Sequence, residues 1–104
     1  MARRIIWSHE AATDLEALAR YIAKDSAFYA TAFVREILEA ARSLKEFAHR
    51  GRVVPEVGNL HIRELFVKEY RLIYRMDESQ VVILGLVHGK RDLGKLWERE
   101  KRGD

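Results

Sequence analysis

The spacing of apolar residues changes once along this chain, and that change constrains the fold more than any other feature. Between His9 and Phe47 apolar residues recur every three or four positions, which is typical of helices that cover an apolar surface with one face. Between Leu60 and His88 three short runs rich in β-branched and aromatic residues follow one another. The pattern therefore predicts an α+β fold in which helices come first and most strands follow.

The first half of the chain is expected to form a strand and a helical hairpin. Arg4–Trp7 is β-branched and aromatic, and Ser8 after it is a residue type that often caps a helix. The first helix is predicted over 9–24. The pair Asp25-Ser26 offers a second cap, after which a longer helix continues to Phe47. Because the connection is short, the two helices should lie antiparallel.

The second half is expected to form a three-stranded antiparallel meander. Its strands are predicted at Leu60–Val67, Tyr70–Met76 and Val81–His88, with Lys68-Glu69 and Asp77–Ser79 as the turns. The segment before these strands holds the single proline and is expected to be an irregular loop. With the N-terminal strand these make one four-stranded sheet, covered by the helices on one face and open on the other.

The composition indicates one folded domain, 1–104, whose residues 89–104 form a basic tail. The chain has 104 residues, 48% of them apolar and 34% charged, and no cysteine, so a disulfide framework and thiolate chemistry are excluded. No segment has the apolar length of a signal peptide core or a membrane span, so we expect a cytoplasmic protein. His9, His49 and His61 show no metal-ligand spacing, so neither a metal nor another cofactor is expected. The net charge of +3 favours an acidic partner.

Several short segments, in this order, resemble the RelE/ParE superfamily of toxins from type II toxin–antitoxin systems. Each segment alone is a weak motif, but together they span nearly the whole chain. They are Trp7-Ser8 with Ala12 and Asp14-Leu15, Tyr21-Ile22, Gly51–Glu56, Ile62–Leu65, Tyr70–Arg75, and His88–Arg91. The resemblance implies a toxin that is neutralised by a cognate antitoxin and arrests growth when it is free.

One activity of the superfamily is metal-independent cleavage of messenger RNA on the ribosome. That reaction needs a base for the 2′-hydroxyl, cations for the pentavalent phosphorane and an acid for the leaving oxygen. The resemblance implies Glu56, Arg71 and His88 as candidates for these roles, which makes a ribosome-dependent endoribonuclease one hypothesis for this chain.

The other activity is inhibition of DNA gyrase by ParE-like members of the superfamily. The ending His88-Gly89-Lys90-Arg91 resembles this subgroup more than the nucleases, in which a catalytic His or Tyr precedes an aromatic C-terminus. We therefore rank gyrase inhibition slightly above mRNA cleavage, and we keep a non-toxic nucleic-acid-binding module as a further alternative.

Basic residues in the meander and in the tail are the candidates for binding a target or the antitoxin. Arg71 and Arg75 are two positions apart on either side of Ile73, so in a regular strand they share one sheet face. If that face is open they form a cationic patch; the alternative is a surface ion pair with Glu64, worth about 0–1 kcal/mol, whose loss would hardly change stability. The face of Arg63 depends on a register that the sequence leaves open.

The tail adds three further candidates for contact with a target or the antitoxin. They are Lys90, Arg91 and Trp97, residue types that often anchor protein interfaces or bind acidic surfaces. The expected antitoxin contribution is an acidic, amphipathic segment that wraps around the domain.

Overall fold

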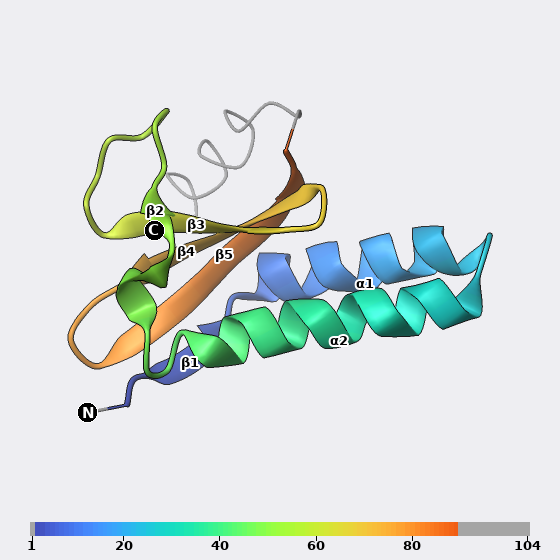
Figure 1. Ribbon diagram of the computed structural model, residues 1–104, viewed down its shortest axis with the longest axis horizontal. Helices are drawn as coiled ribbons and strands as arrows, with labels where there is room; N and C mark the ends of the chain where they lie inside the picture. Colours follow the sequence, from blue (N-terminus) through green and yellow to red (C-terminus); the bar gives the residue numbers. More distant parts are fainter. Residues whose placement is uncertain (1, 90–104) are drawn as a thin grey trace.

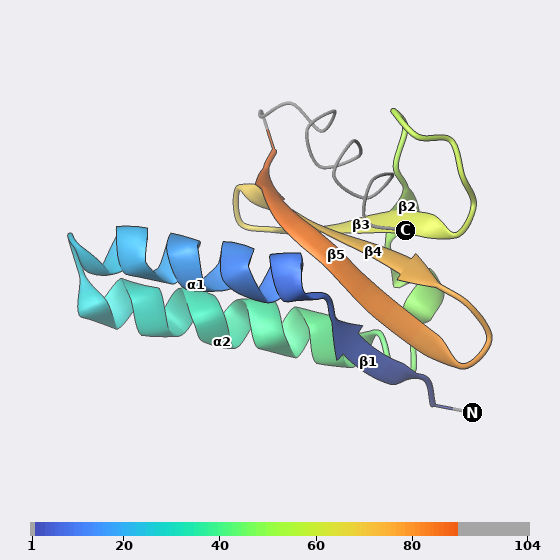
Figure 2. The same cartoon turned by 180° about the vertical axis from the view of Figure 1, so that it is seen from behind.

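The computed structural model describes residues 2–89, in which a helical hairpin covers one face of a five-stranded sheet (Figure 1). The strand order is β1-β5-β4-β3-β2, with β1 parallel to β5 and the other neighbours antiparallel. Figure 2 shows β1 beside β5 at one edge of the sheet. The elements are β1 (Arg4–Trp7), α1 (His9–Ala23), α2 (Ala27–Ser43), a 3-10 turn η1 (Ala48–Arg50), β2 (Arg52–Val53), β3 (Ile62–Val67), β4 (Tyr70–Met76) and β5 (Gln80–His88).

The two predicted helix caps are confirmed. The Ser8 hydroxyl oxygen accepts a hydrogen bond from the Ala11 amide at 3.0 Å, and that of Ser26 accepts one from the Tyr29 amide at 3.1 Å. The second helix is shorter than predicted, because its last turn tightens where the Leu44 amide bonds to the Ala41 carbonyl. Phe47, predicted to end that helix on its apolar face, lies beyond it and is exposed.

The α+β class and the layering are confirmed, and the sheet has one strand more than predicted. The extra strand is β2, whose Arg52 and Val53 lie opposite Glu64 and Arg63 of β3. Two residues are too few to show an alternating pattern, so the sequence predicts a loop for this segment.

A β-bulge in β5 changes which face its last residues occupy. Ile73 of β4 lies opposite Gly85 and Tyr74 lies opposite Ile83, so Leu84 is one extra residue of β5 between these two pairs. Each residue after the bulge therefore projects from the face opposite to the one that strict alternation would give. His88 is the functional candidate affected.

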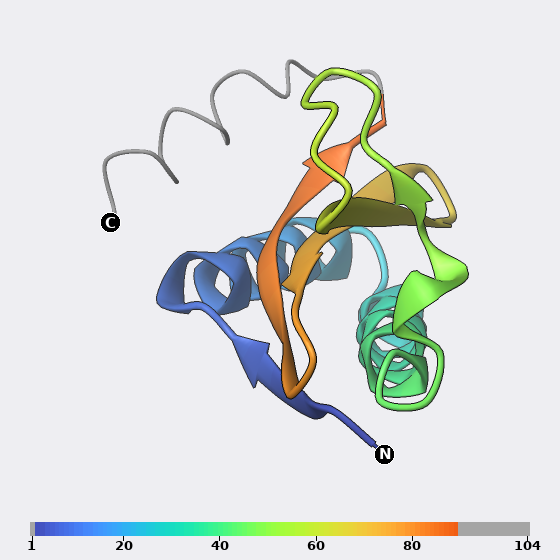
Figure 3. The same cartoon turned by 90° about the vertical axis from the view of Figure 1, so that its left-hand side faces the viewer.

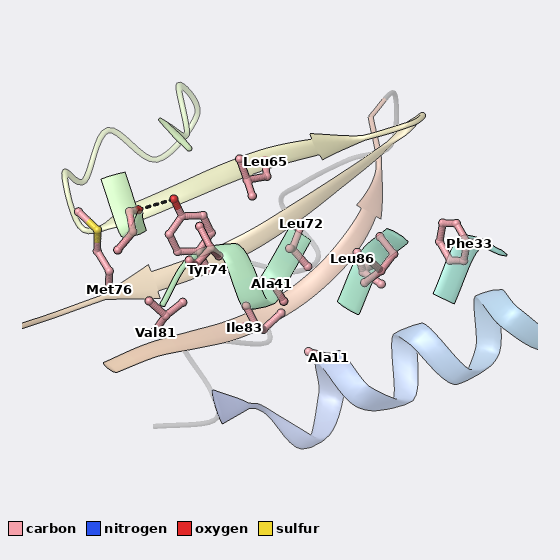
Figure 4. Packing of buried hydrophobic residues seen from close by; sticks show 13 residues of the cluster. Ala11, Phe33, Ala41, Leu65, Leu72, Tyr74, Met76, Val81, Ile83 and Leu86 are labelled. Atoms are coloured by element: carbon pink, nitrogen blue, oxygen red, sulfur yellow. Dashed lines mark hydrogen bonds between the residues drawn. The ribbon is translucent and has the colours of Figure 1, made fainter. Parts of the chain in front are cut away.

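The sheet has an apolar cluster on each face. The cluster beneath the helices is the larger, and Figure 4 shows its side chains converging from the sheet and both helices. The opposite face, called here the outer face, buries Val54, Ile62, Ile73 and Leu84, with Val57 packed against them. The prediction that this face is open is therefore wrong in part: the segment between β2 and β3 supplies Val54 and Val57 to it.

Tyr74 ties the segment before β2 to the sheet. Its side chain is fully buried, and burial raises the pKa of its phenol. The hydroxyl donates to the Ala48 carbonyl at 2.6 Å, drawn as a dashed line in Figure 4, and accepts from the Gly51 amide at 3.0 Å. The chain at Gly51 consequently passes very close to β3 and β4.

We expect Gly51→Ala to destabilise the protein by about 1–3 kcal/mol, the usual cost of overpacking a filled interior. A Cβ at this position would lie 2.5 Å from the Tyr74 hydroxyl and 2.6 Å from the Glu64 carbonyl, and the latter is backbone that cannot turn away. Chemical denaturation measures the loss. Gly58→Asn is the control, since no atom lies within 4 Å of a Cβ there and Asn tolerates its positive φ of 70°. Equal stability of the two variants would contradict the expectation.

No helix among residues 2–89 is both long enough and apolar enough to cross a membrane.

Candidate functional site

Four charged side chains meet on the outer face and form the candidate site. At its centre is Glu64 of β3, whose side chain is 0% exposed. Arg52 of β2 contacts one Glu64 carboxylate oxygen at 2.5 Å, and Arg71 Nη1 lies 3.3 Å from the other. The same Arg71 nitrogen is 3.0 Å from a carboxylate oxygen of Glu56. We call Arg52, Glu56, Glu64 and Arg71 the charge cluster.

Strand register brings the charge cluster together. Alternation along β4 puts Arg71, Ile73 and Arg75 on the outer face, as predicted. Arg52 is opposite Glu64 in the register of β2 with β3, so their side chains project from the same face. Glu56 comes from the segment between these strands, which folds back over the outer face (Figure 3).

Arg71 and Arg75 differ in their surroundings although they share a face. The Arg71 side chain is only 11% exposed, whereas Arg75 is exposed between Ile62 and Val82 on the neighbouring strands. The ion pair of Arg71 with Glu64 is therefore buried, and the surface ion pair considered from the sequence is corrected on this point. A buried pair carries a much larger desolvation cost if one partner is removed.

Phe66 adds an exposed aromatic ring to the site. It follows Glu64 by two positions in β3 and lies opposite Arg71. The guanidinium carbons of Arg52 and Arg71 are 5.2 Å and 5.9 Å from the ring centroid, within the range of cation–π contacts. The ring is 55% exposed, so the site presents positive charge beside an apolar surface.

Glu56 is held in its ionised form. A hydrogen bond from its own backbone amide is the largest cause that lowers the pKa of Glu56; partial desolvation opposes it, and Arg71 lowers the pKa further. A carboxylate stabilised in this way is a weaker base than a free glutamate. The contact with Arg71 nevertheless puts two of the three nuclease candidates side by side.

His88, the third nuclease candidate, lies on the other side of the sheet. The β5 bulge places it opposite Tyr70, and the two rings are 5.4 Å apart. Tyr70 in turn packs against Phe33 of α2, which locates His88 on the helix-covered face. Its Nε2 is 3.5 Å from Glu69. The structure thus brings Glu56 and Arg71 together and separates His88 from them by the thickness of the sheet.

The other residues predicted to bind a target or the antitoxin do not join the charge cluster either. Arg63 is opposite Tyr74, so it projects from the helix-covered side, where it donates hydrogen bonds to the Gly51 and Leu60 carbonyls. Lys90, Arg91 and Trp97 lie outside the described residues. Within 2–89 no group of three or more metal-ligating side chains is present.

Sequence reasoning missed Arg52 and Phe66 and placed Glu64 at the surface. Alternation along β3 puts Glu64 and Phe66 on the same face as Ile62, and that much could be read from the chain. The burial of Glu64 could not, because it depends on which residues of β2 and β4 pair with it.

A second exposed surface lies at the tip of the helical hairpin, which projects beyond the sheet in Figures 1 and 2. Tyr21, Phe28 and Tyr29 are 68%, 78% and 66% exposed there, and the last two rings meet edge to face with centroids 5.8 Å apart. Exposed aromatic residues at one place are typical of protein-binding surfaces.

Two solved structures have a fold similar to that of this chain. One similar structure is described as the chromosomal ParDE TA system from P. aeruginosa; it has a TM-score of 0.68 and 22% identity, covering 84% of this chain and 96% of that one. Another is the toxin–antitoxin complex RelBE2 from Mycobacterium tuberculosis, with a TM-score of 0.62 and 24% identity, covering 85% and 92%. At these identities the similarity shows that the chains share a fold.

The sequence identifies the family. Residues 5–93 match the family model described as the ParE toxin of the type II toxin–antitoxin system, parDE. The chain therefore belongs to the ParE toxin family. No curated protein sequence matches it significantly.

Proposed function

We propose that this protein is held inactive by a cognate antitoxin and, when free in the cytoplasm, arrests growth by inhibiting DNA gyrase. The ParE family match over residues 5–93 is the observation that carries the proposal. The geometry agrees with it, because a nuclease would need Glu56, Arg71 and His88 at one phosphate, and His88 is on the opposite face.

The proposed antitoxin contribution is an acidic, amphipathic segment. The outer face offers it the exposed arginines Arg52 and Arg75 beside the exposed ring of Phe66. Positive charge next to apolar surface is the complement of such a segment. The similar solved structures are themselves described as a toxin–antitoxin system and a toxin–antitoxin complex, which supports a partner of this kind.

Ribosome-dependent mRNA cleavage is the second candidate function, and one observation favours it. Glu56 and Arg71, a carboxylate and a guanidinium that such a reaction could use, are 3.0 Å apart. The lowered pKa of Glu56 and the position of His88 both weigh against it.

The test is to induce the gene alone and together with its neighbouring reading frame. We expect growth arrest in the first case and growth in the second, with the two products co-purifying. The purified toxin should then inhibit supercoiling by gyrase and leave messenger RNA on translating ribosomes uncut. Ribosome-dependent cleavage with unaffected supercoiling would reverse the ranking, and absence of arrest would refute the proposal.

A further inference from the structure

We propose that Arg71 and Arg52 form a carboxylate-binding site on the outer face, which Glu56 fills internally until an acidic side chain of a protein partner replaces it. The site itself follows from the charge cluster and goes beyond the proposed function. Only the identity of the partner depends on the toxin assignment.

The two carboxylates of the charge cluster differ in how firmly they are held. The Glu64 side chain is fully buried and contacts both arginines. The Glu56 side chain is 49% exposed, belongs to the segment between β2 and β3, and contacts Arg71 alone. If Glu56 moves away, two guanidinium groups face one buried carboxylate, and the site gains one net positive charge.

The carboxylates of Glu56 and Glu64 contact only one of the three guanidinium nitrogens of Arg71. Both Glu56 and Glu64 approach the single nitrogen Nη1, at 3.0 Å and 3.3 Å. Arg71 Nε and one Glu64 carboxylate oxygen are buried without a hydrogen-bond partner among the described residues. A guanidinium binds a carboxylate best through two parallel hydrogen bonds, whereas Glu56 contacts Arg71 through one nitrogen alone.

The surroundings indicate which anion the site binds. It already accepts a carboxylate, that of Glu56, and the nearby charge of Glu64 would repel a doubly charged phosphate more than a singly charged carboxylate. Phe66 adds an exposed apolar ring beside the two arginines. These features fit an acidic side chain with an apolar neighbour in a peptide, which is the composition of an amphipathic segment.

The test compares two capped pentapeptides, Gly-Leu-Glu-Leu-Gly and its Gln counterpart, binding to the full-length protein at low salt. We expect Glu56→Gln to bind the Glu peptide roughly tenfold more tightly than the wild type does, because the peptide no longer competes with an internal carboxylate. Glu78→Gln is the matched control: it removes the same charge from the exposed turn between β4 and β5 and should bind like the wild type. Arg52→Gln, added to Glu56→Gln, should reverse the gain.

NMR titration of the arginine Nε–Hε signals identifies the residues that respond and shows that each variant is folded. The proposal fails if Glu56→Gln and Glu78→Gln have equal affinities, or if the Gln peptide binds as well as the Glu peptide. A single-stranded hexanucleotide that binds Glu56→Gln more tightly than the Glu peptide would make the ligand a phosphate and overturn the carboxylate assignment. Growth arrest has no part in this measurement, so its outcome is independent of the toxin proposal.

Discussion

Replacing Arg71 with Ala is expected to lower the free energy of unfolding by about 3–5 kcal/mol, the usual cost of removing one partner of a buried ion pair. Arg71 is 11% exposed and neutralises Glu64, which has no access to water. Domains of this size have a total stability of only about 5–15 kcal/mol, so the variant should be close to unfolding at growth temperature. This reverses the expectation from sequence alone, in which Arg71 and Arg75 could be removed together at little cost.

Urea denaturation of three variants tests the explanation. Arg75→Ala, on the same strand face but exposed, should change stability by less than about 0.5 kcal/mol. Combining Arg71→Met with Glu64→Leu should recover most of the loss, because apolar residues of similar size often replace a buried ion pair without net cost. If Arg71→Ala lowers the free energy of unfolding as little as Arg75→Ala does, then Glu64 is not a buried charge in solution. The described geometry of the charge cluster would then be wrong.

Deleting residues 93–104 is expected to abolish growth arrest, whereas His88→Ala should leave it intact. A gyrase inhibitor acts through protein contact, for which the basic tail and Trp97 are the proposed anchors. His88 packs beside Tyr70 on the helix-covered face, away from Glu56 and Arg71, so its loss should not affect the outer face. In a nuclease, by contrast, loss of His88 as acid or base would cost roughly 10²–10⁴-fold in cleavage.

Both variants must first be shown to be folded, by thermal melting and by capture of the antitoxin. A full-length variant with Lys95, Arg99, Lys101 and Arg102 changed to Gln separates the charge of the tail from its length. Gyrase supercoiling and mRNA cleavage on translating ribosomes are then assayed in parallel. Arrest that survives the deletion but is lost in His88→Ala would contradict the gyrase proposal and favour the nuclease.

The order of elements and the two helix caps could be predicted because they depend on residues that are neighbours in the chain. Ser8 and Ser26 bond to amides three positions later, so the sequence contains both partners within one turn. Alternation within a single strand likewise placed Arg71 and Arg75 on one face. Local spacing was sufficient for each of these predictions.

The make-up of the site, in contrast, was decided by pairing between distant segments. Arg52 and Glu64 meet only because β2, which is too short to predict, pairs with β3 in one register. That pairing, with Arg71 from β4, turns an expected surface glutamate into a buried one.

The position of His88 shows most clearly what local sequence predicts and what strand pairing decides. Strict alternation from Ile83 would have put His88 on the outer face with Arg71, and the one extra residue at the β5 bulge moves it to the helix-covered face. The sequence by itself determined which of the longer segments form strands, because that is a property of neighbouring residues. The tertiary structure alone decided which charges meet, because a strand's register depends on packing against residues far away in the chain.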